Sequence, residues 1–170
     1  MISQPSRYCT VELQALPSRI SQVRRIVSAQ LRYWHLDPLT DLAALGVTEL
    51  LSNVHRHAEP DKRCTVELAL RGNRLTLSVR DHDPRLPVVR DLDAVSTCGR
   101  GLAMVAALSE SWGARPHRDG GKVVWFALPA PSPATALPPV TPHSARGAFR
   151  ADAPGVRVSE HAPARSAVAG

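Results

Sequence analysis

The sequence has few of the residues that characterise metal-rich, secreted or membrane proteins. Its 170 residues include only Cys9, Cys64 and Cys98, which are far apart and form no CxxC pair, so neither a zinc site nor a disulfide framework is expected. No apolar run approaches the ~18 residues of a membrane span. The N-terminus has no basic start followed by an apolar stretch, so no signal peptide is expected. These absences favour a reduced, cytoplasmic setting and no membrane partner.

Aromatic residues are also scarce, at 4% of the chain. The formal net charge is +6, but the cations are arginines scattered along the sequence, and only Lys62 and Lys122 are lysines. Proteins that bind nucleic acids usually gather their cations on one face. We therefore interpret the charge as a solvated, arginine-rich surface and expect no direct nucleic-acid partner, with a basic nucleic-acid-binding domain as an alternative.

Composition divides the chain into two parts. Hydrophobic residues make up 44% of the sequence, enough for one core, but after Leu128 the chain becomes rich in Ala, Pro and Ser. Such a segment buries too little apolar surface to offset its ordering entropy. The sequence therefore predicts a compact domain over residues 8–129 and a disordered, Pro/Ala-rich tail over residues 130–170.

Residues 8–129 show separate helical and strand-like blocks, which predict an α+β fold with helices on one face of a mixed, mostly antiparallel sheet. A strand is expected in CTVELQAL, followed by a helix in PSRISQVRRIVSAQLRYW with Pro17 in its first turn and Ile20, Val23, Val27 and Leu31 on one face. A second helix is expected in DPLTDLAALGVTELLSNVHRHA, with Asp37 as N-cap, and then a hairpin in CTVELALRGNRLTLSVRD that turns at Gly72-Asn73. After a long loop, a third helix is expected in GRGLAMVAALSESWG and a hairpin in ARPHRDGGKVVWFALP that turns at Gly120-Gly121.

The second expected helix carries an unusual line of polar residues. Glu49, Asn53 and His57 follow one another at intervals of four, so they share one face of the helix. An amide oxygen is a suitable ligand for Mg²⁺, and a carboxylate one turn away can orient or deprotonate an attacking hydroxyl. The alternative is an ordinary solvated helix face.

Two further segments have ligand-binding chemistry. Asp81 ends a predicted strand in RDHDP, and its carboxylate could accept a hydrogen bond from an exocyclic amine, although the same residues also suit a plain turn. In TCGRGLAMV, Gly99 and Gly101 flank Arg100 at a helix start, where free N–H groups and a guanidinium suit phosphate. The segment matches neither a Rossmann fingerprint nor a P-loop.

Taken together, the order and spacing of these segments resemble the GHKL (histidine kinase/Hsp90-like) ATPase superfamily, which has the Bergerat two-layer fold. ELLSNVHRHA resembles the N box, DHDP the first glycine box and GRGLAMV the second, and GKVVWFALP resembles the last strand. Within the superfamily, the sequence is most similar to the anti-sigma-factor serine kinases of actinobacterial type.

The resemblance implies a role for each matching residue. Glu49 would be the general base, Asn53 would hold Mg²⁺, and Asp81 would recognise adenine. The phosphates of ATP would lie against Gly99 and Gly101. The helix would begin at Leu102, and residues 85–98 would form a lid.

Two assignments rest on chemistry rather than on the motif. Arg100 is expected on phosphate. His57 is expected to help position the pocket, and the alternative is a capping or surface residue at the helix end. The sequence departs from the family at Asp83-Pro84, where the first box usually has glycine. A second carboxylate there would repel phosphate unless it points away.

The expected activity is transfer of the γ-phosphoryl of Mg·ATP to a serine of an antagonist protein in trans, with Glu49 acting on the hydroxyl. By the resemblance, the partners would be an anti-sigma-factor antagonist, a sigma factor or both, and the protein could form a homodimer. The alternative is an ATP-binding or degenerate module that regulates by contact without catalysis.

Overall fold

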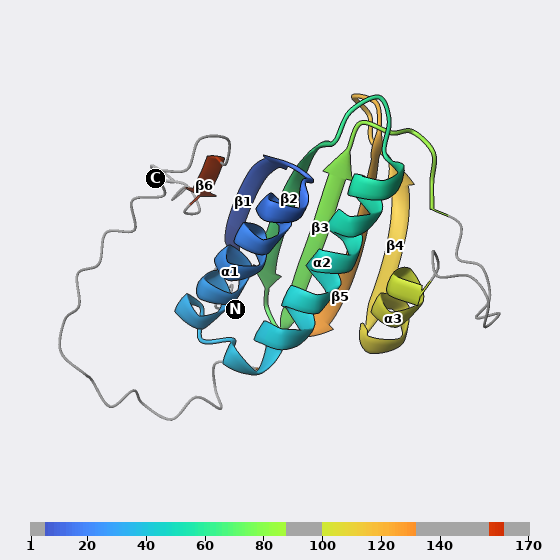
Figure 1. Cartoon of the computed structure of the whole chain (residues 1–170). Helices are drawn as coiled ribbons and strands as arrows, with labels where there is room; N and C mark the ends of the chain where they lie inside the picture. The colour runs from blue at the N-terminus through green and yellow to red at the C-terminus, as the bar shows by residue number, and fades with distance from the viewer. Residues whose placement is uncertain (1–5, 88–99, 132–156, 162–170) are drawn as a thin grey trace, which may run out of the picture.

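A computed structural model describes residues 6–87, 100–131 and 157–161, and it shows a two-layer α+β sandwich (Figure 1). The elements, in chain order, are β1 (Arg7–Gln14), α1 (Pro17–Tyr33), the 3₁₀ turn η1 (Asp37–Leu39), α2 (Thr40–His57), β2 (Arg63–Arg71), β3 (Arg74–Asp81), α3 (Arg100–Leu108), β4 (Ser111–Pro116), β5 (Lys122–Pro129) and β6 (Arg157–His161).

The sheet has the strand order β4-β5-β3-β2-β1-β6, and each neighbouring pair is antiparallel. The three α-helices lie together on one face of this sheet (Figure 1). The expected fold class is therefore confirmed. Among the helices of the described ranges, none has the length and apolarity needed to cross a bilayer.

The first helix forms as its sequence pattern predicts. Pro17 occupies the start of α1, where a missing N–H costs nothing because the first turn has no intrahelical acceptor. The four apolar residues predicted to share a face are all buried: Ile20, Val23, Val27 and Leu31.

The prediction for the start of the second helix was wrong. Asp37 does not cap α2; it begins the 3₁₀ turn, and α2 starts at Thr40 without a side-chain cap. The N–H of Leu39 donates to the carbonyl of Leu36, and that of Thr40 to the carbonyl of Asp37. Asp37 therefore accepts a hydrogen bond through its main-chain oxygen rather than through its carboxylate. The 3₁₀ turn satisfies the N–H groups at the start of α2 that a carboxylate cap would otherwise bond.

Both predicted hairpins are present, although the second begins earlier than expected. Gly72 has φ 55°, and Gly120 and Gly121 have φ 89° and 79°, a backbone region that favours glycine. Residues 111–113, expected at the end of the third helix, instead begin β4. In the register of β4 with β5, Trp112 pairs with Phe126, and packing of the partly buried Trp112 against the core outweighs continuation of the helix.

The C-terminal segment contains one strand where none was expected. Residues 157–161 form β6, which pairs with β1 at the edge of the sheet. The rest of residues 132–170 lies outside the described residues, so the prediction of a disordered tail stays a prediction for them.

The hydrophobic core lies between the helices and the sheet. Leu75, Leu77 and Val79 of β3 face this layer, and each pairs across the strands with a buried residue of β5. From α2, Leu50 and Val54 are buried in the same core. The burial of this apolar face fixes the orientation of α2 and so the position of its polar line.

Candidate nucleotide-binding site

The polar face of α2 lies at the margin of the core. Glu49 and Asn53 are half-buried, and each is followed in the chain by a buried residue, Leu50 and Val54 respectively. Neither polar side chain is hydrogen-bonded to another described residue. Their helical spacing and partial burial leave a carboxylate and an amide, one turn apart, available for a ligand.

Glu49 lies directly against the start of α3. A Cβ atom placed on Gly101 would collide with the Oε2 atom of the Glu49 carboxylate, so a larger residue there would require the Glu49 side chain to move. The first turn of a helix has N–H groups without intrahelical partners. The structure therefore brings together two predicted site residues from separate motifs, the carboxylate of Glu49 and the glycine-containing helix start.

The donor set suits magnesium only in part. Within the described ranges, no group of three or more His, Cys, Asp or Glu side chains could hold a metal ion. Magnesium is usually bound through one or two protein oxygens together with water and substrate phosphates. The Asn53 amide oxygen, beside the Glu49 carboxylate, fits that mode, and it would act as a ligand only together with a nucleotide.

Asp81 is the last residue of β3, and it is 2% exposed. Its Oδ1 atom accepts hydrogen bonds from the Nζ of Lys122 at 3.0 Å and from the N–H of Asp83 at 2.9 Å. Lys122 also donates to the carbonyl oxygen of Asp83 at 3.2 Å. The two hydrogen bonds to this carboxylate from described residues thus both go to Oδ1, which fixes its orientation and leaves Oδ2 for a ligand.

Lys122 was missed by the sequence analysis. It is the register partner of Asp81 across β3 and β5, and its side chain is 11% exposed. Gly121 allows the strands to come this close, because a Cβ there would strike the carbonyl oxygen of Asp81. The only signal in the sequence was a lone lysine at the start of the last strand, next to a glycine pair.

The Asp83 carboxylate, which was expected to repel phosphate unless it points away, is used within the protein. It is paired with the Arg85 guanidinium, with Oδ2 2.7 Å from Nη2, and it accepts hydrogen bonds from the main-chain N–H groups of Arg85 at 2.9 Å and Glu59 at 3.1 Å. Together with the nearby Lys122 ammonium, these contacts hold the pKa of Asp83 well below its usual value, with the Arg85 side chain contributing most.

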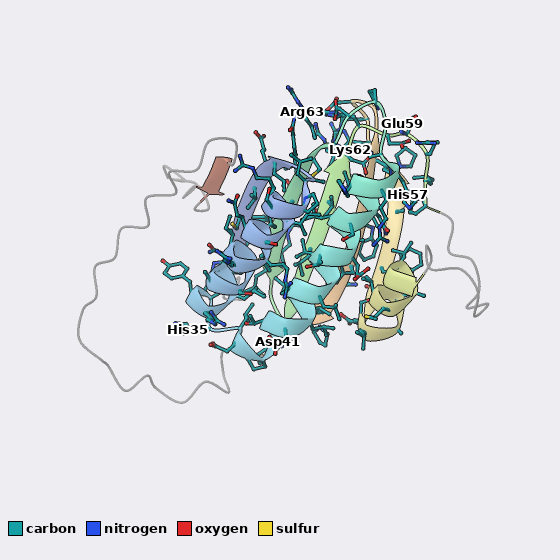
Figure 2. The ribbon with its side chains drawn as sticks, viewed as in Figure 1. His35, Asp41, His57, Glu59, Lys62 and Arg63 are labelled. Atoms are coloured by element: carbon teal, nitrogen blue, oxygen red, sulfur yellow. The ribbon has the colours of Figure 1, made fainter. Side chains whose placement is uncertain are left out.

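Arg85 joins the segment after β3 to the end of α2. Its Nη2 atom donates to the carbonyl oxygen of His57 at 2.9 Å. His57 itself is exposed at this end of the helix, near Glu59 and Lys62 (Figure 2). Its main-chain oxygen is engaged, and a role for its imidazole in the pocket stays a prediction.

The structure describes only some of the remaining predicted site residues. The third helix, α3, begins at Arg100, two residues before the Leu102 start that the resemblance implied, and Leu102 is buried in the core. Gly99 lies outside the described residues, as do residues 88–98 of the expected lid. Contacts of Gly99 and Arg100 with phosphate therefore stay predictions.

Comparison with known proteins agrees with this arrangement. Residues 13–128 match the family model of the histidine kinase-like ATPase domain. A comparison with individual curated proteins gave no significant match to the chain. The matched range runs from the end of β1 through nearly all of β5, so it contains the helix layer, the Asp81 strand end and the start of α3. The chain therefore belongs to the histidine kinase-like ATPase domain family, whose members are ATP-binding domains.

Proposed function

We propose that this protein is a regulatory protein serine kinase of the anti-sigma-factor type, which uses Mg·ATP. The observation that carries the proposal is the contact of Glu49 with the helix start at Gly101. A carboxylate beside free N–H groups lies where a hydroxyl and a transferring phosphoryl group would meet. The partner would be an antagonist protein, a sigma factor or both, in the cytoplasm, and the protein could act as a homodimer.

In this proposal, each residue has one task. Asp81 accepts a hydrogen bond from the adenine amine, and Asn53 holds magnesium, which would offset the charge of the phosphates. Glu49 accepts the proton of the serine hydroxyl while the serine oxygen forms a bond to the γ-phosphorus. The bond from the γ-phosphorus to the bridging oxygen breaks, and ADP leaves.

Binding is tested first by calorimetric titration of Mg·ATP into the wild type and Asp81→Asn. An amide at residue 81 removes the charge that pairs with Lys122 and turns one acceptor into a donor. We expect at least a tenfold loss of affinity, equivalent to about 1.4 kcal/mol. Asp119→Asn, an exposed change in the β4–β5 hairpin, is the matched control and should bind as the wild type does.

Transfer is then tested with γ-labelled ATP and a cell extract from the source organism as acceptor. Wild type should label a protein on serine, and Glu49→Gln should slow the labelling by roughly 10²–10⁴-fold while retaining ATP binding. Equal labelling by wild type and Glu49→Gln would remove Glu49 as the base.

The second candidate is a module that regulates by contact without catalysis. One feature of the sequence favours it: Asp83-Pro84 stands where the family's first glycine box usually has glycine. A wild type that binds Mg·ATP but labels no protein would support this candidate over the kinase.

A further inference from the structure

Asp81 and Lys122 form a largely buried ion pair at one end of the sheet. The two side chains extend from register partners at the ends of β3 and β5, on the helix-facing side of the sheet. They are 2% and 11% exposed, and Nζ lies 3.0 Å from Oδ1. Because both residues belong to the sheet, their relative positions are set by strand pairing rather than by a loop.

The hydrogen-bonding capacity of the pair is only partly used. An ammonium has three donors, and a carboxylate has about four acceptor positions. Described residues provide acceptors for two donors of Lys122, the Asp81 Oδ1 atom and the Asp83 carbonyl oxygen. One N–H of Lys122 and the Oδ2 atom of Asp81 therefore have no partner among the described residues, and because Nζ lies 3.0 Å from Oδ1 of the same carboxylate, a donor adjoins an acceptor.

That pattern is complementary to one edge of a nucleobase. Adenine presents an amino group, which donates, beside ring nitrogen N1, which accepts. A 6-oxo purine reverses the order, with an accepting oxygen beside a donating N1–H. An acceptor at Asp81 with a donor at Lys122 matches the adenine order when the amino group meets the carboxylate.

We propose that Lys122 is a specificity-determining residue, which donates a hydrogen bond to N1 of adenine while Asp81 accepts from the amino group. The inference rests on the proposed ATP binding and adds a second base-reading side chain to that site. The site would then select an amino group adjoining an unprotonated ring nitrogen, rather than an amino group alone.

The test compares ATP with 1-deaza-ATP, in which a C–H group replaces N1 and the amino group remains. Affinities are measured by calorimetry for wild type and Lys122→Met, whose side chain is of similar length but has no donor. Hydrogen bonds to charged groups contribute enough for about a tenfold effect or more. We expect wild type to bind 1-deaza-ATP at least tenfold more weakly than ATP, and Lys122→Met to bind the two within twofold of each other.

Lys62→Met is the matched control, because Lys62 is the only other lysine of the chain and its Nζ donates to the carbonyl oxygen of Ala58. It should keep the wild-type penalty for 1-deaza-ATP. Equal affinity of wild type for the two nucleotides, or an unchanged penalty in Lys122→Met, would overturn the inference while leaving ATP binding intact. A wild type that binds neither nucleotide would instead overturn the proposed function.

A second measurement does not depend on the folding of Lys122→Met. With two lysines in the chain, the Lys122 ¹⁵Nζ resonance can be assigned by its persistence in Lys62→Met. Saturating ATP should shift this resonance, and 1-deaza-ATP should shift it much less. Equal shifts with the two nucleotides would contradict a hydrogen bond from Lys122 to N1.

Discussion

The carboxylate of Asp83 lies 2.7 Å from the guanidinium of Arg85. Asp83 stands where the family motif usually has glycine, and the pair lies against the end of α2. Arg85 also donates to the carbonyl oxygen of His57, and the N–H of Glu59 donates to Asp83. The residues that replace a glycine turn therefore fasten the segment after β3 to the helix that carries Glu49 and Asn53. The added charge is balanced inside the protein.

Asp83→Ala is expected to destabilise the domain. It leaves the main-chain N–H groups of Glu59 and Arg85 without their acceptor, at a cost of about 2 kcal/mol. The Arg85 side chain is 65% exposed, so the ion pair itself contributes little of this cost because water screens it. Chemical denaturation should show the loss, whereas the exposed change Asp119→Ala should alter the free energy of unfolding by less than about 0.5 kcal/mol.

The same carboxylate predicts a dependence of stability on pH. Its pKa is lowered in the folded state, chiefly by Arg85, relative to an unfolded value of about 3.9. The stability that the ionised Asp83 carboxylate contributes is therefore fully present above the unfolded pKa, and it is lost as pH falls through the folded pKa. Between pH 7 and pH 3, Asp83→Asn should lose less free energy of unfolding than wild type does, and parallel curves for the two proteins would contradict the prediction.

Gly101→Ala should reveal the contact with Glu49. The added methyl group collides with the Glu49 carboxylate, so the flexible Glu49 side chain must leave its present conformation, at a cost of about 1 kcal/mol. In a Glu49→Ala background the obstacle is gone, and the higher helix propensity of alanine should make the change neutral or stabilising. A double-mutant cycle of unfolding free energies measures the coupling, and additive effects would show that the two residues do not touch.

Cys64 should be unreactive in the folded protein. It is the register partner of Asp81 across β2 and β3. Burial, followed by the carboxylates of Asp81 and Asp61, raises the pKa of its thiol to about 12, and the thiolate is the reactive form. Iodoacetamide at pH 8 should leave Cys64 unmodified while it alkylates free glutathione in the same tube, as followed by peptide mass spectrometry. Unfolding in guanidinium should restore the reaction; rapid alkylation of the native protein would contradict the burial.

Much of the fold followed from local patterns. The stripe from Ile20 to Leu31 predicted the buried face of α1, and Gly72 and Gly120 marked the two hairpin turns. These signals suffice because they depend on neighbours within one turn or one strand. The start of α2 and the start of β4 were misplaced because backbone hydrogen bonding after Leu36 and the burial of Trp112 against the core decided them.

The sequence by itself determined most of the helices and strands, the line of Glu49 and Asn53 on one helix face, and the resemblance from which their roles are proposed. Only the tertiary structure decided what those residues meet. Lys122 reaches Asp81 through the register of β3 and β5 across 41 residues, and Gly101 reaches Glu49 through the packing of α2 on α3. The physical reason is that spacing along the chain encodes the face of an element, whereas strand register and helix packing arise from the shared core.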